Sequence, residues 1–92
     1  GRFQFDPERQ TLADGGHVRE LSAREAGVLE MLCERMGEIV PTQLILQRIW
    51  GDDTFFNARS LHAFITRLRR LLAADPSVQT VNARGVGYRL HA

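Results

Sequence analysis

Four arginines on one predicted helix and a fifth on a glycine-rich turn are the residues of this chain best suited to bind an anion. They are Arg59, Arg67, Arg69, Arg70 and Arg84. A guanidinium group donates paired hydrogen bonds to a phosphate, or to the O6 and N7 atoms of guanine. A helix face that serves only for solvation normally mixes both signs of charge, yet no acid occurs between Thr54 and Ala74. These residues therefore favour nucleic-acid binding over a merely solvated surface.

The charge of the chain is unevenly divided. Residues 1–53 carry six arginines and ten acids, a balance of −4, whereas residues 54–92 carry six arginines and one acid, a balance of +5. Together these give the net charge of +1. Chance clustering in a short chain is the alternative explanation. A segregated basic half suits a polyanion, and we favour nucleic acid over a membrane surface.

Composition narrows the class of protein. The 92 residues suffice for one small domain, and contents of 43% hydrophobic and 25% charged residues are ordinary for a globular one. No apolar run approaches the roughly 20 residues that span a bilayer, and no signal peptide is visible. The single cysteine, Cys33, cannot form an internal disulfide. We therefore expect a cytoplasmic protein without a membrane partner.

Catalysis and metal binding find little support in the sequence. The three histidines, His17, His62 and His91, are scattered, and one cysteine cannot complete a zinc site with them. Asp52 and Asp53 are adjacent, which suits a helix stop and a solvated loop better than an acid–base pair. No nucleophile elbow or phosphate-binding loop motif occurs. We expect no enzyme, no cofactor and no metal.

The N-terminal half is predicted to form a small sheet and two helices. Strands are expected at 2–6, 10–13 and 17–21, with a tight turn at 14–16. Ser22 and Glu25 form a capping box that opens a first helix, and Gly37 is expected at the C′ position that ends it. After a short extended link at 39–40, a second helix is expected over about 42–50, with Thr42 rather than Pro41 as its cap.

The third helix is the proposed anion-binding element. Asn57 is its expected N-cap, and it continues to about Ala73. On a helical wheel, one buried arc contains Leu61, Phe64, Ile65, Leu68, Leu71 and Leu72. The opposite face is centred on Arg59, Ala63, Thr66 and Arg70, with His62 and Arg69 on one flank and Arg67 on the other. The small side chains at its centre would let the helix approach a DNA major groove closely.

A β-hairpin is predicted to follow, with strands at 78–82 and 88–90. Its turn at 83–87 carries Arg84, and Gly85 and Gly87 permit a tip narrow enough for a minor groove. The expected fold is therefore α+β: a winged helix-turn-helix with an N-terminal antiparallel sheet, three helices and a C-terminal hairpin wing. A winged-helix protein-interaction module that never binds DNA is the alternative function.

Two segments resemble the DNA-binding effector domain of OmpR/PhoB-type response regulators. They are Arg59-Ser60-Leu61-His62-Ala63-Phe64-Ile65-Thr66-Arg67-Leu68-Arg69-Arg70-Leu71 and Val81-Asn82-Ala83-Arg84-Gly85-Val86-Gly87-Tyr88-Arg89-Leu90. The opening of the first helix at 21–25 and Ile49-Trp50-Gly51 share the resemblance. It implies sequence-specific DNA binding in transcription regulation by one domain over 1–92, with helix 57–73 in the major groove and wing 83–87 in the minor groove.

The resemblance also assigns roles to residues. It places Arg59, Ser60, Phe64, Thr66, Arg67, Arg69 and the wing residue Arg84 at DNA-contacting positions. It implies that the loop at 51–57, including Asp52, Asp53, Thr54, Phe55 and Phe56, contacts RNA polymerase. His62 stands where the family usually has an acid, and Thr66 where it frequently has a basic residue.

Further partners are implied for a longer protein. They are an N-terminal receiver domain, absent from this sequence, and a histidine kinase that phosphorylates it. Receiver dimerisation would place two effector domains head to tail on direct repeats, whereas the isolated domain would be monomeric.

Overall fold

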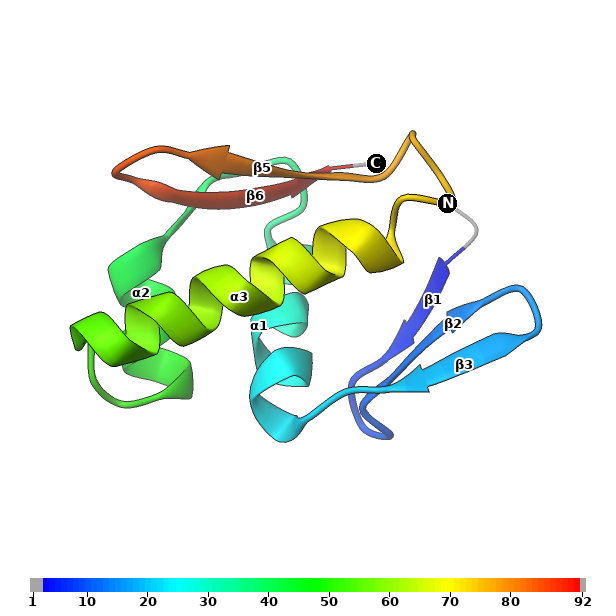
Figure 1. Cartoon of the computed structure of the whole chain (residues 1–92), viewed down its shortest axis with the longest axis horizontal. Helices are drawn as coiled ribbons and strands as arrows, with labels where there is room; N and C mark the ends of the chain where they lie inside the picture. The colour runs from blue at the N-terminus through cyan, green and yellow to red at the C-terminus, as the bar shows by residue number, and fades with distance from the viewer. Residues whose placement is uncertain (1–2, 92) are drawn as a thin grey trace.

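The computed structural model describes residues 3–91, which form two small sheets around three helices (Figure 1). The order is β1 (Phe3–Asp6), β2 (Thr11–Asp14), β3 (His17–Glu20), α1 (Ala23–Glu34), β4 (Val40–Pro41), α2 (Thr42–Ile49), α3 (Phe55–Leu71), β5 (Gln79–Ala83) and β6 (Gly87–His91). The predicted α+β winged-helix architecture is confirmed. Arg2, where the first strand was expected to begin, lies outside the described residues.

The N-terminal sheet is an antiparallel meander in the order β1-β2-β3. Phe5 pairs with Leu12 across β1 and β2, and Leu12 is buried while Phe3 and Phe5 pack at the margin of the core. Gly15 has a φ of 61°, a conformation that costs glycine little, and it permits the tight turn into β3. The sheet lies at the end of the molecule away from the wing tip (Figure 1).

Helix α1 begins with the predicted capping box. The Ser22 hydroxyl accepts a hydrogen bond from the Glu25 backbone N–H at 3.1 Å, and Glu25 Oε1 accepts one from the Ser22 N–H at 2.9 Å. Gly37 has the left-handed φ of 84° expected of a glycine that ends a helix, but α1 stops at Glu34 with Arg35 as its C-cap, one residue earlier than a Gly37 at C′ implies. The Gly37 N–H donates to the Leu90 carbonyl of β6 at 2.8 Å. This bond joins the segment after α1 to the wing sheet.

The caps of α2 and α3 also differ from prediction. Pro41, not Thr42, is the N-cap of α2, and no side chain caps that helix. Thr54 caps α3, because its hydroxyl accepts from the Asn57 N–H at 3.2 Å. Asn57 therefore lies inside the first turn, where its side-chain amide donates to the Asp52 carbonyl at 3.1 Å. Helix α3 ends at Leu71 instead of about Ala73.

The wing sheet has three strands in the order β4-β6-β5, where a two-stranded hairpin was predicted. The extended link after α1 supplies β4, which pairs Val40 with Tyr88 and Pro41 with Gly87. The Thr42 N–H, at the start of α2, donates to the Val86 carbonyl at 3.0 Å. The wing is thereby joined to the first turn of α2.

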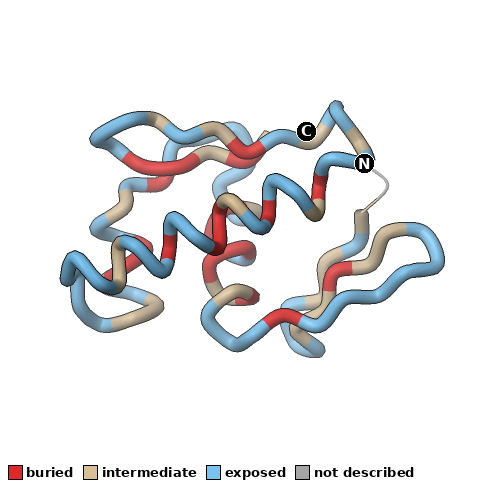
Figure 2. The backbone as a smooth tube through the Cα atoms, in the orientation of Figure 1, coloured by how far each residue is buried: buried red, intermediate tan, exposed pale blue. Residues whose placement is uncertain are grey.

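The core lies where the three helices meet the inner face of the wing sheet. Leu32, Ile45, Leu61, Ile65 and Leu68 are among its fully buried side chains. Buried positions recur turn by turn along α3 (Figure 2). The predicted buried arc of α3 is confirmed, except that Leu71 is only half-buried. Within 3–91, no helix has both the length and the apolar character required to cross a membrane.

Candidate nucleic-acid interface

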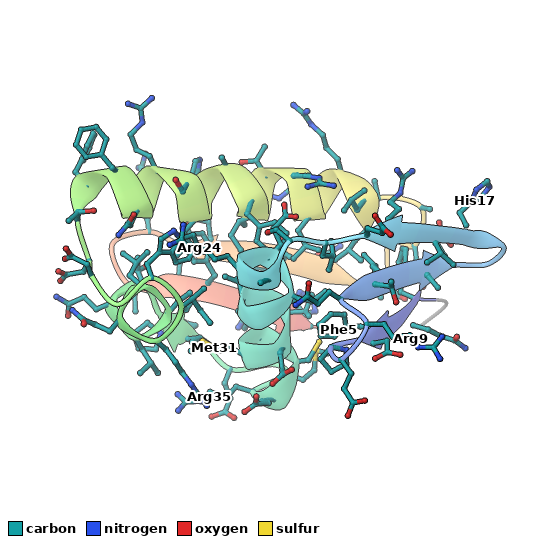
Figure 3. The ribbon with its side chains drawn as sticks, turned by 90° about the horizontal axis from the view of Figure 1, so that it is seen from below. Phe5, Arg9, His17, Arg24, Met31 and Arg35 are labelled. Carbon is teal, nitrogen blue, oxygen red and sulfur yellow. The ribbon has the colours of Figure 1, made fainter. Side chains whose placement is uncertain are left out.

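The outward side of α3 is the most basic of the exposed surfaces that the helices and strands present. Arg59, Ala63 and Arg70 are exposed along it, and Thr66 is half-exposed, so the wheel placed these four correctly on the outer side of the helix. Side chains project from this side in a row, away from α1 (Figure 3). Helix α3 contains no acid, and Arg69 and Arg70 lie in its last turn, where cations are favoured by the helix dipole.

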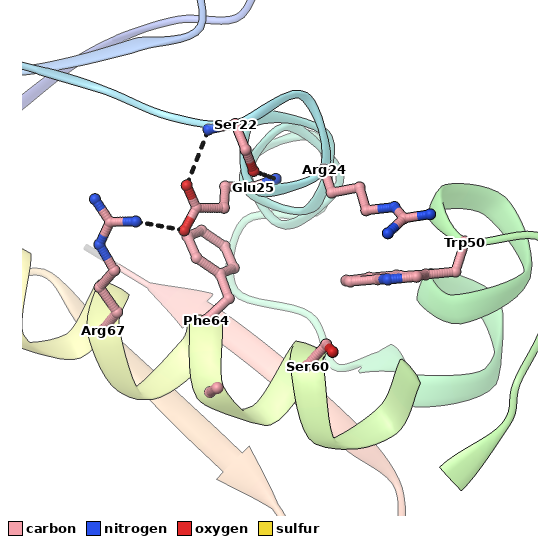
Figure 4. Close-up of a pocket in the computed structure, with 8 residues that line it drawn as sticks. Ser22, Arg24, Glu25, Trp50, Ser60, Phe64 and Arg67 are labelled. Carbon is pink, nitrogen blue, oxygen red and sulfur yellow. Dashed lines mark hydrogen bonds and ion pairs between the residues drawn. The ribbon is translucent and has the colours of Figure 1, made fainter. Parts of the chain in front are cut away.

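One flank of this face contacts the start of α1. Arg67 Nη1 lies 2.6 Å from Glu25 Oε2, and the two side chains are 49% and 18% exposed. The same carboxylate closes the capping box through its other oxygen (Figure 4). Glu25 thus holds the Arg67 guanidinium at the edge of the exposed face. Local sequence patterns gave no sign of this ion pair, because its partners are 42 residues apart.

A shallow depression adjoins that ion pair. Its lining comes from three helices and consists of Ser22, Arg24, Glu25, Trp50, Ser60, Ala63, Phe64 and Arg67. The guanidinium carbon of Arg24 lies 5.5 Å from the centre of the Trp50 ring, a cation–π arrangement that fixes both groups (Figure 4). Sequence reasoning assigned no DNA contact to Arg24 or Trp50. Only the folded structure brings both beside Ser60 and Arg67.

The other flank faces the wing. His62 Nδ1 lies 3.4 Å from the Tyr88 hydroxyl of β6, and burial raises the pKa of that hydroxyl. Further along α3, Arg69 lies beside residues at the start of β5, including Gln79 and Thr80. The helix and the wing therefore meet along the side that carries His62 and Arg69.

The two hydroxyl side chains on α3 are turned toward its own backbone. The Ser60 hydroxyl donates to the Phe56 carbonyl at 3.2 Å, and the Thr66 hydroxyl donates to the His62 carbonyl at 3.0 Å. Their hydroxyl protons are therefore engaged. What Thr66 can offer an external partner is its methyl group and the acceptor lone pairs of its oxygen.

Phe64 packs into the core. The resemblance assigned it a DNA contact, but its side chain is buried, at 6% exposure, and belongs to the core cluster. The helical wheel had placed it correctly. A phenylalanine at this position contributes apolar burial at the base of the depression.

The segment before α3 also differs from the expected loop. Phe55 and Phe56 form the first turn of α3, so the connection between α2 and α3 is only 50–54. Both rings are strongly exposed, at 72% and 77%, and meet edge to face with centres 6.2 Å apart. The Arg59 guanidinium carbon lies 5.8 Å from the Phe55 ring centre. An exposed aromatic pair therefore stands beside the basic face.

The turn of the wing presents Arg84 to solvent. Arg84 and Val86 are exposed on either side of Gly85, whose φ of 76° permits the narrow tip. Arg84 is at the far end of the β5–β6 hairpin, separate from the arginines of α3. A basic helix and a basic hairpin tip thus form two distinct candidate contacts.

This fold, with a basic exposed third helix joined to a hairpin wing, defines a winged-helix domain of the kind that binds DNA. Residues 16–90 match the family model described as "Transcriptional regulatory protein, C terminal". Because the match extends over most of the chain, the protein belongs to that family. The resemblance to OmpR/PhoB-type effector domains is confirmed.

Known relatives agree with this assignment. The transcriptional regulatory protein RprY of Bacteroides fragilis is 41% identical over 90 residues, which cover 98% of this chain and 38% of that protein. The sensory transduction protein RegX3 of Mycobacterium tuberculosis is 32% identical over 92 residues, covering 98% and 40%. The chain therefore spans about two fifths of the length of these curated relatives.

Solved structures show the same fold. The DNA-binding domain of RstA from Klebsiella pneumoniae, determined in complex with the RstA box, is 26% identical with a TM-score of 0.77. The match covers 99% of this chain and 92% of that one. The DNA-binding domain of CpxR from E. coli is 25% identical with a TM-score of 0.77, covering 99% and 91%.

Proposed function

We propose that this domain binds double-stranded DNA in a sequence-specific manner and thereby regulates transcription. The observation that carries the proposal is the outward side of α3, which presents arginines and small side chains without an acid. The RstA domain, which has the same fold, was solved with its DNA box. The proposed function needs no cofactor and includes no catalytic step, and its setting is the cytoplasm.

Helix α3 is proposed to enter the major groove and the 83–87 wing the neighbouring minor groove. Arg59, Ala63, Thr66 and Arg70 would face base edges, with the Thr66 methyl suited to a thymine methyl. Ser60, Arg67 and Arg69, with Arg24 and Trp50 beside the depression, would meet phosphates or the groove rim. Phe64 is 6% exposed and lines the same depression, and its contact with DNA stays a prediction of the resemblance.

Salt dependence tests the proposal directly. Affinity for a nonspecific duplex should fall with salt, with a log–log slope of about −0.9 per neutralised phosphate. Selection from a random duplex pool should then recover a preferred sequence. The absence of duplex binding even at low salt would sink the proposal and leave the protein-interaction module as the function.

Arg84→Ala tests the wing. The variant should bind more weakly, by about 1 kcal/mol, with the largest loss on A·T-rich flanks, whose narrow minor groove attracts arginine. Arg35→Ala is the matched control, since Arg35 has the same charge but lies on the side of α1 away from α3 (Figure 3). Equal affinities of the Arg84→Ala and Arg35→Ala variants on every flank would refute minor-groove insertion.

The segment 52–56 is proposed to contact RNA polymerase. Support comes from the rings of Phe55 and Phe56 beside Asp52 and Asp53, which are 72% and 77% exposed although Arg59 lies against one face of Phe55. Phe56→Ala is the cleaner test, because Phe55 also packs against Arg59. This variant should keep its DNA affinity but lose binding of its DNA complex to purified polymerase. Retained polymerase binding would contradict the proposal.

A longer protein is proposed to control this domain. The chain spans about two fifths of its curated relatives, which leaves room for a receiver domain and regulation by a histidine kinase. In that protein, phosphorylation would pair two effector domains on direct repeats. The isolated domain is expected to sediment as a monomer, and a stable dimer without DNA would contradict this scheme.

A further inference from the structure

The contact between His62 and Tyr88 joins the exposed helix face to a buried group of the wing. Tyr88 is only 6% exposed, and its hydroxyl lies 3.4 Å from His62 Nδ1, within hydrogen-bond reach. His62 itself is exposed on α3. One imidazole nitrogen is therefore occupied by the wing, and the other, Nε2, remains for an external partner.

The contact links the tautomer of His62 to the direction of the Tyr88 hydrogen bond. A neutral imidazole has one N–H donor and one acceptor nitrogen. Burial favours the neutral, protonated phenol of Tyr88, which can donate its O–H to Nδ1. When the phenol donates, Nδ1 is the acceptor and the ring proton lies on Nε2; the phenol oxygen could instead accept from an Nδ1–H. The contact with the wing thus couples the tautomer of His62 to the Tyr88 hydroxyl.

The electrostatic surroundings of His62 are neutral or cationic. Arg59 shares the surface depression in which His62 lies, together with Ala58 and Ala63, and Arg69 lies further along the same flank. From β6, the group that faces it is Tyr88. Helix α3 has no acid that could accept a hydrogen bond from Nε2–H. The natural acceptor for this donor is therefore one supplied by a bound molecule.

We propose that His62 reads a guanine through its Nε2–H and that Tyr88 is the positioning residue that fixes this tautomer. Guanine offers two adjacent acceptors, O6 and N7, on its major-groove edge. Adenine places an amino donor beside its N7, thymine offers only O4 beside its methyl group, and cytosine presents its N4 amino donor, so guanine fits an Nε2–H donor best. The inference rests on the proposed function and deepens it. It assigns the preference for one base to His62, and it makes Tyr88 of the wing sheet a residue that affects this preference.

The first experiment examines the free protein. Long-range proton–nitrogen correlation spectra of the neutral imidazoles should show the Nε2–H tautomer at His62. Tyr88→Phe keeps the buried ring but removes the hydroxyl, and should shift His62 toward a mixture of tautomers. A predominant Nδ1–H form at His62, or spectra unchanged by Tyr88→Phe, would overturn the role of Tyr88 whatever the domain binds.

The second experiment examines base preference by selection from a random duplex pool. The wild type should prefer guanine at one position by about 5- to 100-fold. His62→Ala and Tyr88→Phe should weaken that preference and leave the others in place, while His62→Asp, an acceptor, should move it toward cytosine. His17→Ala, on the N-terminal sheet, is the control and should change nothing.

The outcomes distinguish DNA binding by the domain from base reading by His62. An equal loss on all sequences, or an unchanged preference in His62→Ala, would overturn base reading by His62 while leaving DNA binding intact. If the wild type binds no duplex at all, the proposed function fails, and base reading by His62 fails with it. The tautomer spectra still decide whether Tyr88 orients the ring.

Discussion

Replacing Gly87 by alanine is expected to destabilise the domain by about 3 kcal/mol or more, at or above the upper end of overpacking effects. A Cβ atom at this position would overlap the Val40 carbonyl oxygen, and would lie 2.8 Å from the Val40 carbonyl carbon and 2.9 Å from Pro41 Cα. All three are backbone atoms, so no side-chain rotation can relieve the clash. The β4–β6 pairing would have to open.

Chemical denaturation with a matched glycine variant measures this effect. Gly16→Ala is the control, because a methyl group at that position would have no heavy atom within 4 Å and the backbone there is not left-handed. It should change the free energy of unfolding by less than about 0.5 kcal/mol. Gly87→Ala should lower the melting temperature by on the order of 10–20 °C for a domain of this size. A Gly87→Ala variant as stable as the control would contradict the close approach of β4.

Replacing Arg67 by alanine is expected to weaken binding to the preferred duplex by about 1–3 kcal/mol. The variant loses a cation at the rim of α3. It also leaves Glu25, which is 18% exposed, with an uncompensated negative charge close to the proposed phosphate path. The stability of the free domain should change by less than about 1 kcal/mol, since the Arg67 side chain is half-exposed. Fluorescence anisotropy titrations and thermal unfolding would separate the two effects.

Glu25→Gln provides the partner variant for a double-mutant cycle. Its amide oxygen can still accept from the Ser22 N–H, so the capping box keeps its geometry while the negative charge is removed. Combined with Arg67→Ala, it should restore part of the lost affinity. A loss of equal size on all sequences would support the proposed phosphate contact, whereas a loss confined to the preferred duplex would make Arg67 a base contact. Wild-type affinity in Arg67→Ala would reduce its role to the ion pair with Glu25.

Features encoded within one or two helical turns were predictable from the sequence. The Ser22–Glu25 capping box is confirmed in both of its bonds, and the apolar spacing of α3 identified the buried Phe64 even though the family resemblance placed it on DNA. The wheel predicted this burial because burial follows from the periodicity of this chain's own helix.

The sequence could not decide between two residues that are equally good caps for the same helix. Thr54 and Asn57 are both good caps three residues apart, and the intervening Phe55 and Phe56 are exposed in either case, so no burial pattern separates them. The bond from Gly37 to Leu90, which follows the end of α1, joins residues far apart in the chain. The same holds for the Glu25–Arg67 pair and for strand β4, whose partners are distant in sequence.

The attachment of β6 to the helical body has a consequence for the shape of the target. Its Leu90 carbonyl bonds the backbone after α1, and the wing turn bonds the first residue of α2 through Val86. These backbone bonds hold the wing to α1 and α2, and α3 packs against α2 and β5, so the offset between α3 and the hairpin tip in the proposed complex is set within the fold. Any mismatch in groove spacing must be absorbed by bending or twisting of the duplex. Sites whose base steps deform easily would then bind best, even at pairs that no side chain touches.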